Sequence, residues 1–275
     1  MKRSSFVFRT RVECTLFVAT LLAALLAGAV RAESCAATSG PRIVPLVELY
    51  TSEGCNSCPP ADRWLSSTVP AAANGQTAIA LAFHVDYWDR LGWKDRFATA
   101  AWTERQYAMA NANRSRLVNT PQVLLQGHDF PEWHGRGSAA TLAAIASKPA
   151  RATIALEAQP QQGTIRVKAT ATVPASADRK NAALFIALAD SRLVSNVKAG
   201  ENAGVRLTHD HVVRALRAGM AVSASGEAGG DVTFSLPAET GVAPTLVAFV
   251  QNTDNGDVLQ ALALPLAQGA CTTQR

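Results

Sequence analysis

The chain has 275 residues, of which 48% are hydrophobic and 17% are charged, and its net charge is +5 from 26 Lys and Arg against 21 Asp and Glu. This composition is too apolar for a disordered chain, and its apolar residues are too dispersed for a protein that crosses a membrane several times. The length allows one or two domains with a sizeable core. The positive charge and the odd number of cysteines, five, become informative once their positions are known.

The first 32 residues have the pattern of a cleaved secretory signal. Basic residues precede an uncharged run from Thr15 to Val30, and Ala32 provides a small side chain at the expected cleavage point. The run is shorter than the roughly 20 residues that a spanning helix needs, which favours cleavage over a retained N-terminal anchor. We therefore expect a periplasmic or secreted protein with no stable membrane anchor after cleavage.

Removal of this segment changes both the charge and the cysteine count. Five bases and one acid lie within residues 1–32, so 21 bases and 20 acids remain. A nearly neutral chain without a run of basic residues gives no reason to expect a nucleic-acid partner. The even number of cysteines that remains permits disulfides in an exported protein, with three possible pairings among Cys35, Cys55, Cys58 and Cys271.

Residues 41–150 alternate between strand-like and helix-like segments. Apolar runs predict buried strands at 43–51, 77–85 and 121–127, the last with a hairpin partner, and helices are predicted after Cys58, over 94–114 and over 137–148. This order predicts an α/β domain with a mixed sheet and helices on both of its faces.

Residues 151–268 have a different texture. Short segments that alternate apolar and polar residues, such as TIRVKATATV, are separated by Gly, Pro, Asn and Asp at short intervals. This pattern predicts an antiparallel β-sandwich as a second domain.

The strongest chemical signal is the pair Cys55 and Cys58, separated by two residues at the junction of a predicted strand and helix. Two sulfurs at this spacing meet across one turn and can cycle between dithiol and disulfide, and a helix N-terminus stabilises the thiolate of the first cysteine. The second cysteine resolves the mixed disulfide. With a strand before it and a helix after it, the pair predicts a thioredoxin-like domain.

The dipeptide Thr120-Pro121 opens the predicted strand at 121–127. Thioredoxin-like folds begin this strand with a cis proline that faces the cysteine pair, and the residue before it offers backbone groups to a bound peptide. We therefore expect a cis bond and a substrate contact here, the alternative being an ordinary trans proline at the start of a strand.

These motifs together resemble a family of secreted bacterial proteins with a thioredoxin-like fold that is catalogued as domain of unknown function 1223. The resemblance covers most of the chain after the signal and rests on VELYTSEGCNSCPPADRWL, FHVDYWDRLGWKDRF, VNTPQVLLQG and GENAGVRLTHDHVVRAL. It implies the fold more firmly than a reaction. The chain has Gly54 where thioredoxins have an aromatic residue before the first cysteine, which leaves the redox direction and the partner open.

Three polar residues are candidates for supporting the cysteine pair. His84 and Asp86 follow a predicted strand and should emerge at the edge of the sheet that carries sites in open α/β folds. Glu48 lies in the first strand, where an acid can take the proton of the second cysteine. The alternatives are a loop histidine, a turn or capping aspartate and a solvated strand glutamate.

The remaining signals are weaker. Cys35 and Cys271 lie near the two ends of the exported chain, which are often neighbours, so a structural disulfide between them is expected, the alternative being two free or intermolecularly paired thiols. His209 and His211 would share a face of a strand, but two histidines are weak evidence for a metal site. The four tryptophans between residues 88 and 133 are better explained as core than as a peptide groove.

The sequence therefore favours an exported thiol–disulfide oxidoreductase that acts on a thiol or disulfide of a protein partner and needs no cofactor. One alternative is a protein that binds copper or another soft metal through Cys55, Cys58 and His84. Another is a binding protein whose Cys55–Cys58 pair is a static structural disulfide. The direction of electron transfer, the substrate, the role of the second domain and the oligomeric state are not encoded in these patterns.

Overall fold

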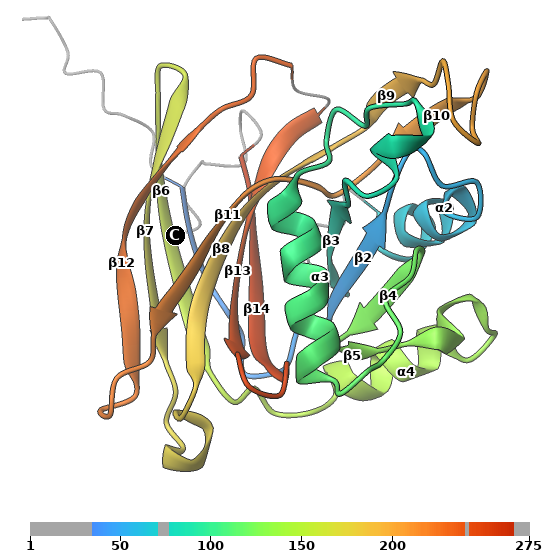
Figure 1. Ribbon diagram of the computed structural model, residues 1–275. Coiled ribbons are helices and arrows are strands. Elements are labelled where there is room, and N and C mark those ends of the chain that lie inside the picture. Colours follow the sequence, from blue (N-terminus) through green and yellow to red (C-terminus); the bar gives the residue numbers. More distant parts are fainter. Residues whose placement is uncertain (1–34, 71–76, 240–241, 267–275) are drawn as a thin grey trace, which may run out of the picture. The chain divides into compact units, whose positions relative to one another are not determined.

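An eight-stranded mixed sheet joins the two halves of the chain in the computed structural model, which describes residues 35–70, 77–239 and 242–266 (Figure 1). Its strand order is β14-β13-β8-β11-β3-β2-β4-β5. Strand β3 runs parallel to both of its neighbours, β2 and β11, and every other pair is antiparallel. The bounds are β2 (Leu46–Thr51), β3 (Ile79–His84), β4 (Gln122–Leu125), β5 (His128–Asp129), β8 (Ala182–Ser191), β11 (Val212–Ala221), β13 (Val242–Asn252) and β14 (Val258–Pro265).

A second, four-stranded antiparallel sheet packs on the β8, β13 and β14 side of the large sheet. It contains β1 (Cys35–Thr38), β6 (Thr153–Gln161), β7 (Thr164–Thr172) and β12 (Glu227–Ser235), in the order β1-β6-β7-β12. In β7 the buried side chains Ile165, Val167 and Ala169 alternate with more exposed ones, as expected of a strand with one solvated face. They pack on Ile186 of β8 and Ala248 of β13, so a common core fills the space between the sheets.

Helices cover both faces of the β2–β3–β4 region. Strand β2 directs Leu46 and Tyr50 towards α3 (Ala100–Ala112), and Val47 and Leu49 towards α2 (Pro59–Thr68). Because both faces are covered, β2 is an almost uninterrupted apolar run. Helix α4 (Ser138–Ala146) lies on the α2 side. Two further strands form a small hairpin, β9 (Leu193–Asn196) and β10 (Arg206–His209), and single turns form η2 (Asp89–Leu91), η3 (Pro131–His134) and η4 (Ser176–Asp178).

The predicted fold class, a thioredoxin-like α/β domain followed by a β-sandwich domain, is wrong. The chain is mostly β, with three α-helices in the described ranges, and strands from both halves form one sheet across the predicted boundary near residue 150. Val212 of β11 lies opposite Ala82 of β3, and Ala82 N donates to His211 O over 2.8 Å. The predicted order of strands and helices from β2 to α4 is observed, but β11 satisfies the edge of β3 that a separate domain would have left open.

None of the helices in the part of the chain that the structure describes is both long and apolar enough to span a bilayer. The predicted signal, residues 1–32, lies outside the described residues.

Candidate functional site

A disulfide joins Cys55 and Cys58 between the end of β2 and the start of α2, with their Cα atoms 5.5 Å apart. Cys58 caps the helix, and its carbonyl oxygen accepts from Ala61 N at 2.8 Å and Asp62 N at 3.2 Å. Pro59 and Pro60 occupy the first turn of α2, where their missing N–H groups cost little. Asn56 and Ser57 are exposed, whereas both cysteines are 0% exposed. Residues 52–58, which we call the cysteine loop, therefore reach the surface while the two sulfurs stay buried.

The turn between β9 and β10, residues 197–205, bonds the backbone of the cysteine loop, and we call this turn the strap. Asn202 Nδ2 donates to the carbonyl oxygens of Glu53 and Cys55, each at 2.9 Å. Glu201 Oε2 accepts from Asn56 N at 3.1 Å. The strap thus binds the cysteine loop through side chains from the second half of the chain. Nothing in the local sequence pattern of residues 197–205 indicates this long-range contact, so no role is predicted for them from sequence.

A histidine–aspartate pair lies on the α2 side of β3. His84 Nδ1 and Asp95 Oδ2 are 2.7 Å apart, and both residues are buried. Asp95 also accepts from Glu53 N, which ties the pair to the cysteine loop. Burial alone would lower the pKa of His84, but the Asp95 carboxylate outweighs it and raises that pKa above its ordinary value. Burial would likewise raise the pKa of Asp95, and the interaction with His84 lowers it instead.

Two more acids and a second histidine extend this pair into a buried network. His209 of β10 stacks edge-on against His84, with ring centroids 4.8 Å apart, and its Nε2 lies 3.3 Å from Glu53 Oε1. Glu53 Oε2 accepts from Trp93 Nε1 at 2.6 Å. Burial opposes ionisation of Glu53, yet the contact with His209 lowers its pKa. The network is defined by Glu53, Asp62, His84, Asp95 and His209.

Asp62 differs from the other carboxylates of the network. It lies one helical turn after Cys58, accepts from Thr51 Oγ1 at 3.1 Å and is half-buried. Desolvation raises its pKa, in contrast to Asp95. Acids whose environments push their pKa values apart can hold and release protons separately. No role is predicted for Asp62 from sequence, although its i+4 spacing from Cys58 is a signal that could have identified it.

The three predicted supporting residues are separated by the fold. His84 belongs to the buried network. Asp86 does not, because its carboxylate accepts from Thr103 Oγ1 at 2.6 Å and anchors the loop to α3. Glu48 points to the α3 face of β2, opposite α2, and pairs there with Arg105 at 2.7 Å. The role of Glu48 as the acid that takes the proton of the second cysteine stays a prediction, and its carboxylate faces Arg105 and not α2.

The Thr120–Pro121 peptide bond is cis, as predicted. Thr120 Oγ1 accepts from Trp88 Nε1 at 2.7 Å, and Trp88 in turn packs beside Gly54. A Cβ added at Gly54 would lie 3.1 Å from Trp88 Cβ, so a larger residue before Cys55 would require Trp88 to shift. Beside Pro121 lies an open cavity of about 320 Å³, whose wall includes Leu117, 66% exposed.

The tryptophans serve different purposes. Trp102 is core, as expected, whereas Trp88 and Trp93 bond to Thr120 and Glu53 beside the cysteine loop. Trp133 packs against Trp64 of α2, with ring centroids 5.4 Å apart.

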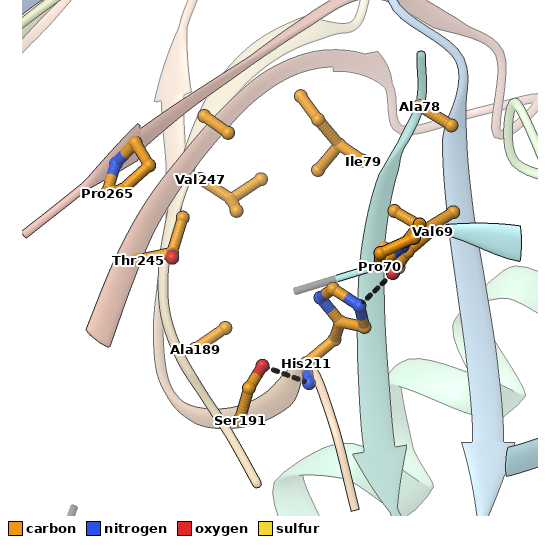
Figure 2. A pocket seen from close by; sticks show the side chains of 12 residues that line it. Val69, Pro70, Ala78, Ile79, Ala189, Ser191, His211, Thr245, Val247 and Pro265 are labelled. Carbon is orange, nitrogen blue, oxygen red and sulfur yellow. Dashed lines mark hydrogen bonds between the residues drawn. The ribbon is translucent and has the colours of Figure 1, made fainter. Parts of the chain in front are cut away.

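His209 and His211 do not share a site. His211 lies in the turn after β10, where its Nε2 donates to Val69 O at 2.6 Å and its backbone N donates to Ser191 Oγ at 3.0 Å (Figure 2). It lines a cavity of about 30 Å³, and burial lowers its pKa. Across the described ranges, no group of three or more His, Cys, Asp or Glu side chains is arranged to hold a metal ion.

The expected Cys35–Cys271 disulfide stays a prediction. Cys35 is buried at the start of β1, and Cys271 lies outside the described residues.

The fold and the site define a mainly β protein with a large mixed sheet and a covered cysteine pair at the head of a helix. The chain belongs to the family described as Protein of unknown function (DUF1223), whose model matches residues 46–251. The predicted membership of this family is thereby confirmed, whereas the thioredoxin-like fold expected with it is wrong and secretion stays a prediction.

Two solved structures are similar in fold. Protein AGR_C_4864 from Agrobacterium tumefaciens has a TM-score of 0.58 and 23% identity, over 86% of this chain and 99% of that one. HBP35 of Porphyromonas gingivalis has a TM-score of 0.61 and 14% identity, over 86% of this chain and 80% of that one. At these identities the likeness concerns the fold alone. No curated protein matches the chain significantly.

Proposed function

We propose that the protein is an exported thiol–disulfide oxidoreductase that exchanges disulfides with a protein partner through Cys55 and Cys58. The observation that carries the proposal is the disulfide between these residues at the N-terminus of α2. A helix start supplies unpaired N–H groups and the positive end of the helix dipole, and both favour a thiolate at the first cysteine.

The exchange starts from the oxidised form. A partner thiolate attacks Cys55 Sγ, the Cys55–Cys58 bond breaks, and Cys58 leaves as a thiolate that takes up a proton. A second thiolate of the partner then attacks the partner's sulfur in the mixed disulfide and releases Cys55 as a thiolate. The partner loses two electrons and becomes a disulfide, and Cys55 and Cys58 gain them as a dithiol. In the reverse sequence a disulfide of the partner oxidises the Cys55–Cys58 dithiol.

Asp62 is the residue best placed to exchange a proton with Cys58. Residues four apart share one side of a helix, so both side chains lie on the same side of α2. The raised pKa of Asp62 keeps its proton to a higher pH than an ordinary aspartate would. A carboxyl of this kind acts as the acid when Cys58 leaves and as the base when it attacks.

A non-catalytic binding protein is the second candidate, because both sulfurs are completely covered. In that case the disulfide would be structural and resistant to reduction. The copper alternative stays a prediction, which anaerobic titration of the reduced protein with Cu(I) tests.

A trapping experiment tests the proposed exchange. In Cys58→Ser the mixed disulfide at Cys55 cannot be resolved, so covalent complexes should accumulate in the exporting cell and dissociate on reduction. Cys55→Ser/Cys58→Ser is the matched control and should trap nothing. If the single variant also traps nothing and the wild type catalyses no exchange in vitro, the proposal fails. N-terminal sequencing of the same material should begin at Glu33 if the proposed signal cleavage occurs.

A further inference from the structure

The strap bonds the backbone of residues 53, 55 and 56, next to the disulfide that a partner has to reach. Asn202, only 6% exposed, bonds the carbonyl oxygens on both sides of Gly54. A disulfide is attacked along the approach to its sulfur, so a reaction at Cys55 depends on access. The 0% exposure of Cys55 shows that this access is closed in the oxidised protein.

The strap is shaped to lie close against the loop. Gly200 has a φ of +74°, and a Cβ built there would lie 3.4 Å from Trp93 Cβ and 4.0 Å from Gly54 Cα. Gly204 N donates to Val197 O, and Val205 N donates to Asn202 O, so the turn is held together by its own backbone. A turn with internal bonds at the end of the β9–β10 hairpin can lift from the loop as one piece.

The side chain of Glu201 makes this closure sensitive to the state of the cysteines. Its carboxylate accepts from Asn56 N, one residue after Cys55. A thiolate formed at Cys55 adds a second negative charge at the same helix start, and like charges at short range repel. The strap is therefore held more weakly once Cys55 is reduced and ionised.

We propose that the strap, residues 197–205, is an autoinhibitory cover of the Cys55–Cys58 disulfide and must open before a thiol reaches Cys55. Its biological meaning rests on the proposed exchange function, since it would regulate that site. The partner chain and the strap then compete for the carbonyl oxygen of Cys55 and the N–H of Asn56. The cover itself exists whether or not the protein has an exchange partner.

The test measures the rate at which dithiothreitol reduces the disulfide. Dithiothreitol supplies two electrons and two protons, the protein disulfide becomes two thiols, and the reagent closes to its cyclic disulfide. Asn202→Ala removes both bonds to the loop without changing the charge, and we expect reduction at least tenfold faster than in the wild type. Lys198→Ala, an exposed strap residue, is the control and should stay within twofold.

A second pair of variants separates the cover from simple charge. Glu201 is exposed, so its replacement does not threaten folding. Glu201→Gln removes the charge and keeps an acceptor for Asn56 N, whereas Glu201→Ala removes both. We expect Glu201→Ala to be reduced about threefold faster than Glu201→Gln.

Two results together would overturn the proposal. The first is equal reduction rates in Glu201→Ala and Glu201→Gln. The second is an Asn202→Ala variant whose reduction rate is within twofold of the wild-type rate, or which is misfolded by circular dichroism. Faster reduction in the strap variants without any trapped partner would support the proposed role of the strap and contradict the proposed exchange function. Trapped partners with unchanged strap variants would do the opposite.

Discussion

His209 Nε2 lies 3.3 Å from Glu53 Oε1, with both side chains buried, although the two residues belong to opposite halves of the chain. Glu53 is two residues before Cys55, and His209 is the last residue of β10. The surroundings of the cysteine pair are therefore completed by the second half, which also supplies Asn202. The second half is part of the site and not only a support.

The first prediction concerns Asp62. Replacement of Asp62 by Asn keeps an acceptor for Thr51 Oγ1 and removes the titrating carboxyl. Because proton transfer by a positioned side chain typically contributes roughly 100-fold or more, the exchange rate should fall by at least about tenfold. Stopped-flow measurement of exchange against pH checks this, and the variant should lose the ionisation that belongs to Asp62.

The stability of Asp62→Asn should change in the opposite direction. A carboxyl with a raised pKa favours the folded state when protonated, and this contribution is lost as the pH rises through its folded pKa. The variant should therefore unfold at a higher denaturant concentration than the wild type at pH 7, with little difference at pH 3. Asp86→Asn is the matched control, because Asp86 contacts Thr103 outside the network. An unchanged exchange rate in Asp62→Asn would remove Asp62 from the mechanism.

The second prediction concerns the His84–Asp95 pair. The pKa of His84 is raised, so its contribution to stability is complete below the ordinary histidine pKa of about 6.5 and is lost as the pH rises through the folded value. In Asp95→Asn the strongest opposing carboxylate is lost and only the weaker effects of Asp62 and Glu53 oppose burial, so the pKa of His84 should fall below its ordinary value. The contribution of His84 should then be lost as the pH falls, which reverses the sign of the dependence.

The size of this effect follows from the loss of a charged hydrogen bond. We expect Asp95→Asn to lose about 2 kcal/mol of unfolding free energy at pH 6. Denaturant unfolding across pH 5 to 9 and NMR titration of the His84 ring measure the two quantities. A His84 pKa that stays above its ordinary value in the variant would contradict the assignment.

The third prediction separates Glu48 from the chemistry. Glu48→Leu leaves Arg105 buried and unpaired, which should cost about 3–5 kcal/mol of unfolding free energy. Glu48→Leu/Arg105→Met should recover most of this loss, because the two apolar side chains fill the same space. In both variants the reduction rate and the potential of the Cys55–Cys58 pair should match the wild type. A tenfold slower exchange in folded Glu48→Leu would return Glu48 to the site.

The local features of the site were predictable from sequence. A strand, a cysteine pair and a helix with prolines in its first turn are neighbours in the chain, and short-range rules cover them. Pro121 also follows from its place at a strand start. The face of β2 on which Glu48 lies was also predictable, because side chains alternate along a strand and Glu48 therefore shares a face with Leu46 and Tyr50.

The fold class and the rest of the site depend on pairings that local patterns do not reveal. Strand β8 is buried along almost its whole length, and such a run is typical of an interior strand with both faces covered. This apolar run indicates that β8 is not the edge strand of a simple sandwich, but it does not identify β11 as the strand that pairs with β3. The contacts of Asn202 and His209 with residues near Cys55 join positions that are about 150 residues apart, beyond the reach of any periodicity.

The reduction potential of the Cys55–Cys58 pair tests the central claim most directly. Equilibration of the full exported chain against glutathione or dithiothreitol buffers, read by thiol alkylation, gives this value, and Cys55→Ser/Cys58→Ser serves as the blank. An exchange enzyme should have a potential between about −120 and −270 mV, the range of proteins that pass disulfides to partners. A potential far below about −300 mV would identify the pair as a structural disulfide and contradict the proposed function.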